Sequence, residues 1–271
     1  MSKPSSSDNI DSDAPKSTEA EISGKKAKRR SSKLLKFFVA ASLIISIFAL
    51  LGSDNYFEDP FDPPSDIEGF IKEISESIVL IECNAWGTGF AFNIGEESTD
   101  PDFQTHIVTN FHVIDECVND VQSLIVAIGP NHETKVRSKI MATDEKNDLA
   151  ILLINVEIPV LEPAQEYAVP GWWSMAIGNP VDTDIDPPVV LRNSTTFGHI
   201  SYVHDSYWNY TSATINGGNS GGPLVNSIGE VIGINTLASA STEDGVWNVS
   251  IDTAALCLKL INNSNYCEYT P

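Results

Sequence analysis

Short apolar runs recur along the chain from about residue 66 onward, and Gly, Asn, Asp or Pro separates one run from the next. The runs are rich in Val, Ile and Thr, and they cover residues 77–82, 89–94, 123–128, 135–142, 149–156, 212–215, 230–234 and 246–251. Short strands at this spacing are typical of a β-barrel or β-sandwich rather than a parallel α/β sheet. We therefore predict an all-β domain.

Helical periodicity is convincing in only two places. In residues 67–78, the side chains of Ile67, Phe70, Ile71 and Ile74 share one helical face. The second place is residues 253–261, which predict a helix close to the C-terminus. About 200 residues are ample for one β domain with two such helices.

The N-terminal region has a different composition. Residues 2–24 are rich in Ser, Asp, Glu and Pro and are too polar to bury a core, which predicts disorder. A basic cluster at 25–33 precedes residues 37–51, which carry no charge. Basic residues directly before an apolar segment keep the N-terminus in the cytoplasm and send the following chain across the membrane. A cleaved signal peptide is the alternative, although no Ala-x-Ala pattern follows the apolar core.

These patterns divide the chain into four parts. We expect a disordered cytoplasmic tail (1–33), a single-pass transmembrane signal anchor (34–52), a linker (53–66) and one folded domain (67–271). On this interpretation, the folded domain lies outside the cytoplasm at the cell membrane.

Charge divides the chain at nearly the same place. Residues 1–36 carry nine Lys or Arg and five Asp or Glu, which leaves seven basic and 32 acidic residues in the remainder, a net charge of −25. A domain this acidic is repelled by nucleic acid, so we exclude nucleic acid as a partner. The charge is consistent either with a solvated surface or with a field that favours basic or neutral substrate segments.

Three separated residues carry the candidate chemistry. Ser220 lies in a glycine-dense turn, and a serine becomes a nucleophile only when a base removes its proton and donors stabilise the oxyanion. His112 lies at the exit of the apolar run 107–109, where a short helical turn is expected. Asp148 lies where the buried strand 149–156 opens, and a carboxylate there can orient an imidazole.

The surrounding motifs resemble the chymotrypsin-fold serine proteases, and most closely the HtrA type. The matching segments are TNFHV at 109–113, NDLA at 147–150, GNSGGPL at 218–224, GTGFAF at 87–92, AIGNP at 176–180 and GEVIGIN at 229–235. The resemblance runs from about residue 66 to 260. It implies two packed antiparallel β-barrels with a Ser-His-Asp triad between them and a C-terminal helix. Only residues 221–271 follow Ser220, so we expect no C-terminal PDZ domain, which HtrA-type proteins often carry.

The resemblance also implies a role for each site residue. Ser220 would be the nucleophile, His112 the general base and acid, and Asp148 the orienting carboxylate. The backbone N–H groups of Gly218 and Ser220 would form the oxyanion hole. Further residues implied for substrate binding are Thr214 and Ile215 in an apolar S1 pocket, and Asn235 and Thr236 along the substrate backbone. No metal or cofactor is implied, and no Cys-x-x-Cys or His-x-x-x-His spacing indicates a zinc site.

The four cysteines, Cys83, Cys117, Cys257 and Cys267, all follow the apolar segment, so disulfides can persist if that part is exported. Four cysteines allow three pairings. By the resemblance, Cys83 and Cys117 would staple the loop that carries His112, and Cys257 and Cys267 would join the predicted C-terminal helix to the tail. Free thiols remain the alternative.

The sequence therefore predicts a membrane-anchored extracytoplasmic serine endopeptidase that acts on protein or peptide substrates, with a role in the quality control of exported proteins. The alternative is a catalytically inactive protease fold that serves as a binding or scaffold module. A homotrimer formed through the barrel surface is left open.

Overall fold

The computed structural model describes residues 60–252 apart from 96, 97, 99, 205–207, 237, 238, 243 and 244, and it describes only the backbone of 239–242, 245–249, 251 and 252. No helix within these residues is long and apolar enough to cross a membrane. The predicted anchor at 34–52 and the predicted helix at 253–261 lie outside the described residues, as do Cys257 and Cys267. The four-part division of the chain therefore stays a prediction.

One α-helix, α2 (Ile67–Ser75), opens the described domain. The Asp66 side chain caps it by accepting the Gly69 N–H at 3.0 Å, and Glu68 and Lys72 lie at the ends that the helix dipole favours. Ile74 is buried, and Phe70 packs edge-on against Trp173 with a ring-centroid distance of 5.9 Å. The predicted helical face is confirmed except at Ile67, which is exposed because it lies at the helix start.

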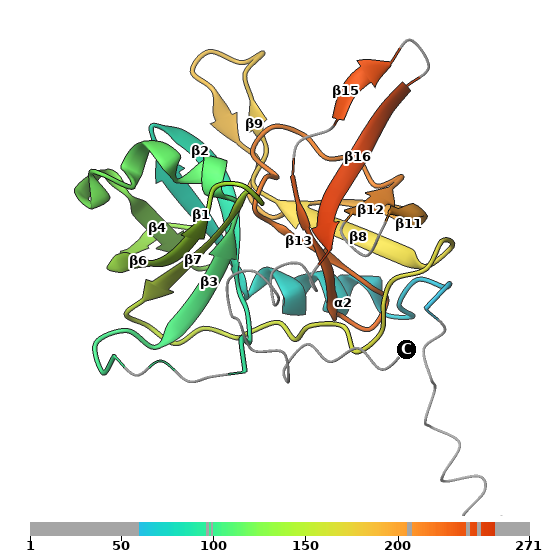
Figure 1. Cartoon of the computed structure of the whole chain (residues 1–271), viewed down its shortest axis with the longest axis horizontal. Coiled ribbons are helices and arrows are strands. Elements are labelled where there is room, and N and C mark those ends of the chain that lie inside the picture. The colour runs from blue at the N-terminus through green and yellow to red at the C-terminus, as the bar shows by residue number, and fades with distance from the viewer. Residues whose placement is uncertain are drawn as a thin grey trace, which may run out of the picture. The chain divides into compact units, whose positions relative to one another are not determined.

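The first sheet is antiparallel and holds seven strands in the described residues, in the order β5-β4-β1-β2-β3-β7-β6. Its strands are β1 (Ile78–Cys83), β2 (Ala85–Ala91), β3 (Thr105–Thr109), β4 (Ile125–Ile128), β5 (Thr134–Val136), β6 (Ser138–Asp144) and β7 (Leu149–Ile154). Strands β5 and β6 stand at opposite edges, yet only Arg137 separates them in the sequence. The sheet must therefore curl until its two edges meet (Figure 1).

The second sheet also holds seven strands in the described residues, in the order β12-β11-β8-β13-β14-β16-β15. Its strands are β8 (Trp173–Gly178), β11 (Ser194–His204), β12 (Trp208–Thr211), β13 (Pro223–Val225), β14 (Val231–Asn235), β15 (Ser239–Thr242) and β16 (Gly245–Asp252). An additional pairing of β12 with β16 closes six of these strands into a ring. A small hairpin of β9 (Val181–Asp182) and β10 (Val189–Val190) projects between the two sheets in the view of Figure 1.

Apolar side chains fill both curled sheets and the seam between them. One cluster lies inside the first sheet and includes Ile107, Ile114 and Leu152, all fully buried. A second cluster lies inside the second sheet and includes Ala176, Leu224 and Ile232. A third joins α2 to both sheets through residues such as Ile74, Phe90 and Met175. The seam is therefore buried like the interior of each sheet.

A disulfide joins Cys83 at the end of β1 to Cys117, at a sequence separation of 34. The enclosed loop contains β2, β3 and the segment that carries His112, so the predicted pairing is confirmed. By loop-closure entropy, a disulfide that spans this many residues stabilises a fold by about 3–4 kcal/mol.

Most of the predicted strands are confirmed within a few residues. The segment 212–215 is the exception: it lies outside the strands and leads into the Ser220 turn. Strand β11, the longest among the described residues, is absent from the predictions because Ser, Thr, Gly and His interrupt its apolar residues and leave no apolar alternation.

Candidate active site

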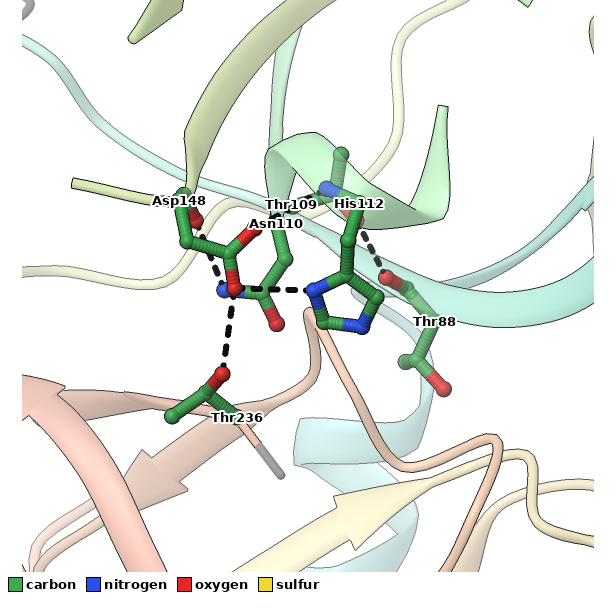
Figure 2. Close-up of polar contacts among 6 residues, drawn as sticks. All are labelled: Thr88, Thr109, Asn110, His112, Asp148 and Thr236. Carbon is green, nitrogen blue, oxygen red and sulfur yellow. Dashed lines mark hydrogen bonds and ion pairs between the residues drawn. The ribbon is translucent and has the colours of Figure 1, made fainter. Parts of the chain in front are cut away.

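The backbone that follows β3 places His112 just beyond the C-terminal end of that strand. β3 ends at Thr109, Asn110 is extended, and a single 3₁₀ turn spans Phe111–Val113. The backbone N–H of His112 donates to Asp148 Oδ1 at 2.9 Å, and the ring Nδ1 lies 2.8 Å from Asp148 Oδ2 (Figure 2). The carboxylate thus holds both the main chain and the ring of His112, which fixes the direction of the imidazole.

Asp148 occupies the turn between β6 and β7 with a left-handed backbone, φ +54°. Asp tolerates this conformation better than most residues. The Asn110 side-chain amide donates to the Asp148 carbonyl at 2.9 Å, which anchors the turn to the segment before His112. The carboxylate also accepts the Thr236 hydroxyl at 3.1 Å. The carboxylate of Asp148 is therefore held by three donors, the His112 N–H, the His112 ring and the Thr236 hydroxyl, as Figure 2 shows.

This pair has the arrangement that a general base needs. Because the carboxylate accepts, Nδ1 donates the proton of the neutral ring, and Nε2 is left with a free lone pair on the opposite side. The two side chains are only about one third exposed (36% and 29%), so the protein surrounds most of the contact.

The turn that carries Ser220 comes from the second sheet but lies against the first. The Ser220 carbonyl accepts the Thr88 N–H at 2.9 Å. A Cβ on Gly221 would lie 2.2 Å from Thr109 Oγ1 and 3.0 Å from the Asn110 nitrogen. Gly221 therefore packs against the residues that lead directly into His112, and only glycine fits this contact.

Ser220 is buried, with 5% of its surface exposed. Within the described residues, no hydrogen bond joins the Ser220 hydroxyl to the His112 ring. Such contacts are often long without substrate and shorten in the reacting complex. The structure thus packs the turn that carries the predicted nucleophile against the residues that lead into the predicted base, without a formed hydrogen bond between Ser220 and His112.

The predicted oxyanion donors, the N–H groups of Gly218 and Ser220, differ from the neighbouring N–H groups in their hydrogen bonding. The N–H groups of Asn219, Gly221 and Gly222 donate to carbonyls of the protein. Those of Gly218 and Ser220 have no such acceptor among the described residues. The Gly217 carbonyl accepts the Val181 N–H at 3.1 Å, and a planar trans peptide then points the Gly218 N–H in the opposite direction. Two unused N–H groups in one glycine turn can stabilise an oxyanion.

The residues predicted to bind substrate take different positions. Thr214 is exposed, whereas Ile215 is 6% exposed and packs in the core of the second sheet. Their assignment to an S1 pocket stays a prediction. The Thr236 hydroxyl bonds to Asp148, a role that nothing in the local sequence indicates.

The prediction for Asn235 is contradicted. Its N–H donates to the Gly222 carbonyl at 2.7 Å, and its carbonyl accepts the Gly221 N–H at 2.8 Å. Its side chain is fully buried, donates to the Pro223 carbonyl and accepts the Ser250 hydroxyl. All of these groups are used inside the protein, so Asn235 holds the Ser220 turn on β14 instead of lying along a substrate.

Two other features of the described residues lie apart from this site. A cavity of about 470 Å³, lined in part by Phe103, Thr105 and His106, lies at the start of β3, whereas His112 follows its end. No cluster of three or more His, Cys, Asp or Glu that could hold a metal ion occurs within the described residues of 60–252.

Comparison with known proteins gives consistent matches. The family model of the trypsin-like peptidase domain matches residues 87–234, more than half of the chain. Putative serine protease HhoB of Synechocystis is 32% identical over 177 residues, which cover 62% of this chain and 38% of that protein. Serine endoprotease DegS of Escherichia coli is 36% identical over 150 residues, which cover 53% of this chain and 40% of that protein. The chain thus spans about two fifths of the length of these relatives.

A solved structure agrees with these relatives. The crystal structure of the serine endoprotease from Yersinia pestis matches with a TM-score of 0.55 and 28% identity, over 72% of this chain and 65% of that one. The expected chymotrypsin-like fold is thereby confirmed as two curled antiparallel sheets with one helix in the described residues. The chain belongs to the family of trypsin-like peptidase domains, with HtrA-type serine proteases among its relatives.

Proposed function

We propose that the protein is a serine endopeptidase that hydrolyses peptide bonds of protein substrates through Ser220, His112 and Asp148. The observation that carries the proposal is the pairing of His112 with Asp148 beside a serine turn that has two unused N–H groups. The names of the relatives, serine protease and serine endoprotease, support the same reaction class.

The reaction follows from this geometry in two steps. Ser220 Oγ attacks the scissile carbonyl carbon while His112 Nε2 takes the hydroxyl proton, and Asp148 stabilises the resulting imidazolium. The negative oxygen of the tetrahedral intermediate accepts the N–H groups of Gly218 and Ser220. The intermediate collapses when His112 returns the proton to the leaving amine. Water then attacks the acyl-enzyme with His112 again as the base, which releases the acid and restores Ser220.

The direct test compares the full-length wild type with Ser220→Ala in detergent, with an unfolded protein such as casein as the substrate. We expect wild type to release peptides and to be labelled covalently by a fluorophosphonate, and Ser220→Ala to do neither while its melting temperature is unchanged. Absence of both activities in folded wild type would contradict the proposal and favour a binding or scaffold module.

The substrates and the location are part of the proposal. Residues 34–52 anchor the chain in the membrane, with the peptidase domain on the extracytoplasmic side, where it degrades misfolded exported proteins. The basic cluster before this apolar segment supports the orientation. Carbonate extraction of membranes, followed by N-terminal sequencing, tests the anchor. An extractable protein that begins after residue 52 would contradict it and favour a cleaved signal peptide.

A further inference from the structure

Thr88 lies in β2 of the first sheet, where that sheet meets the turn that carries Ser220. The side chain is completely buried, so it has no access to substrate. It nevertheless contacts the second sheet through both its side chain and its main chain.

The Thr88 hydroxyl bridges two backbone groups of the second sheet. It accepts the N–H of Asn179, which follows β8, at 2.8 Å, and it donates to the Gly218 carbonyl at 2.7 Å. A hydroxyl has one proton to donate and lone pairs to accept, so both contacts form at once. The contact with Gly218 is the one that reaches the proposed oxyanion hole.

The main chain of Thr88 adds two contacts. Its N–H donates to the Ser220 carbonyl at 2.9 Å. Its carbonyl accepts the Thr109 hydroxyl at 2.7 Å, which Figure 2 shows beside His112. One residue therefore holds the carbonyls of both Gly218 and Ser220 and also contacts the strand that leads to the base.

Three glycines make room for this residue. A Cβ on Gly178 would lie 2.9 Å from Thr88 Oγ1, one on Gly221 would lie 2.2 Å from the Thr88 carbonyl oxygen, and one on Gly222 would lie 3.1 Å from Thr88 Cγ2. Distances this short exclude ordinary side chains at Gly178 and Gly221 without a shift of the backbone.

Gly218 needs an external restraint. It has a φ of +99° and no side chain, so many backbone conformations are open to it. The Val181 N–H fixes the Gly217 carbonyl, and the Thr88 hydroxyl fixes the Gly218 carbonyl. Together these contacts determine where the Gly218 N–H points.

We propose that Thr88 is a positioning residue for the reaction, and that its hydroxyl holds Gly218 in the conformation that presents the oxyanion donor. The inference rests on the proposed peptidase function. Loss of the hydroxyl leaves the Gly218 carbonyl and the Asn179 N–H without their partner, and the turn relaxes to satisfy them elsewhere. Since Thr88 never touches substrate, the effect appears in the transition state rather than in substrate binding.

The test measures kcat and KM for a peptide substrate with Thr88→Val and Thr88→Ser in the full-length protein. We expect Thr88→Val to lower kcat about 10²-fold, near the cost of losing an oxyanion donor, with KM changed by less than about threefold. Thr88→Ser keeps the hydroxyl, and we expect it to retain kcat within about threefold of wild type. The affinity for a peptide boronate, which mimics the tetrahedral intermediate, falls in parallel with kcat.

Thr105→Val is the matched control. The Thr105 hydroxyl donates to the Val156 carbonyl at the same 2.7 Å and is 4% exposed, but it lies at the far end of β3. This control loses a comparable buried hydrogen bond, so its melting temperature falls while its kcat stays near wild type.

The outcomes separate the two claims. If wild type is active and Thr88→Val is as active as Thr105→Val, the role of Thr88 is overturned and the peptidase proposal stands. If wild type is inactive, the peptidase proposal itself is overturned. If Thr88→Val does not fold, Thr88→Ala and Thr88→Ser form a second pair that differs only in the hydroxyl. Equal kcat values in that pair would overturn the inference, and a much lower kcat for Thr88→Ala would support it.

Discussion

The two halves of the proposed active site are held in different ways. His112 and Asp148 belong to the first sheet, and side-chain hydrogen bonds fix them to each other. The Ser220 turn comes from the second sheet, and main-chain contacts fix it together with the Thr88 hydroxyl, with glycines where the backbones meet. The base and acid thus depend on hydrogen bonds to each other, whereas the nucleophile depends on close packing of the two sheets and on one hydroxyl, that of Thr88. Each half should therefore fail in its own way.

Replacing the acid is the change with the largest expected effect. Asp148→Asn keeps the shape of the side chain but puts an amide against the His112 ring, which favours the wrong tautomer. We expect kcat/KM to fall about 10⁴-fold, with little change in KM. Steady-state kinetics with a fluorogenic peptide measure this, and thermal denaturation provides the control. A loss smaller than about tenfold would show that Asp148 does not orient the base.

The Ser220 turn should instead be sensitive to added atoms. In Gly221→Ala the new Cβ would overlap Thr109 Oγ1 and the Thr88 carbonyl, and φ at this position is +83°. We expect a loss of about 2–5 kcal/mol in the free energy of unfolding, from strain and overpacking together. Displacement of the turn by about 1 Å also lowers kcat/KM at least about 10²-fold.

Gly217→Ala is the matched control for this prediction, because no atom lies within 4 Å of a Cβ at Gly217. Urea denaturation and peptide kinetics on the two variants give the comparison. Equal stability and activity of Gly221→Ala and Gly217→Ala would contradict the close packing of the turn against the first sheet.

Thr236 follows β14 of the second sheet, and its hydroxyl donates to Asp148 of the first sheet. A change at Thr236 therefore tests whether the two halves of the active site act together. Thr236→Val removes one of the three donors to the Asp148 carboxylate, and the two from His112 remain. A hydrogen bond to a charged group contributes about 1.5–3 kcal/mol, and we expect kcat/KM to fall about tenfold. Thr236→Ser should recover most of the activity. If Thr236→Ser and Thr236→Val have the same activity, the hydroxyl has no part in orienting the acid.

A buried histidine of the first sheet gives the smallest expected effect, on stability alone. Burial, with a contribution from Arg192, lowers the pKa of His132 below its ordinary value. Its Nε2 bonds to the Ile78 carbonyl at 3.1 Å, and its Nδ1 has no partner among the described residues. His132 therefore binds a proton more tightly in the unfolded chain than in the folded one. Its contribution to the free energy of unfolding is fully present above about pH 6.5 and is lost as the pH falls below that value.

We expect a loss of about 1.4 kcal/mol for each unit by which the pKa of His132 is lowered. His132→Asn should remove this dependence, because Asn tolerates the left-handed φ of +49° and does not titrate. Urea denaturation between pH 7.5 and 5 measures it in both proteins. Identical pH profiles of stability would contradict the assignment to His132.

The same contrast explains what the sequence could predict. The turn at His112, the boundary at Asp148 and most strands follow from local patterns of apolar and polar residues, because each is decided by near neighbours. The roles of Thr236 and Asn235 could not be predicted. Thr236 lies 88 positions from Asp148 in the sequence, and the side-chain groups of Asn235 are hydrogen-bonded to Pro223 and Ser250. Strand β11 was also beyond prediction, because it carries no apolar alternation.

The central claim is that Ser220, His112 and Asp148 act as one unit. Its most direct test is peptide mapping by mass spectrometry after reaction with a fluorophosphonate, together with the labelling rates of wild type and His112→Gln. We predict a single covalent adduct on Ser220 in wild type, with a rate that falls at least about 10³-fold in His112→Gln. An adduct on another residue, or a rate at Ser220 that does not depend on His112, would contradict the claim.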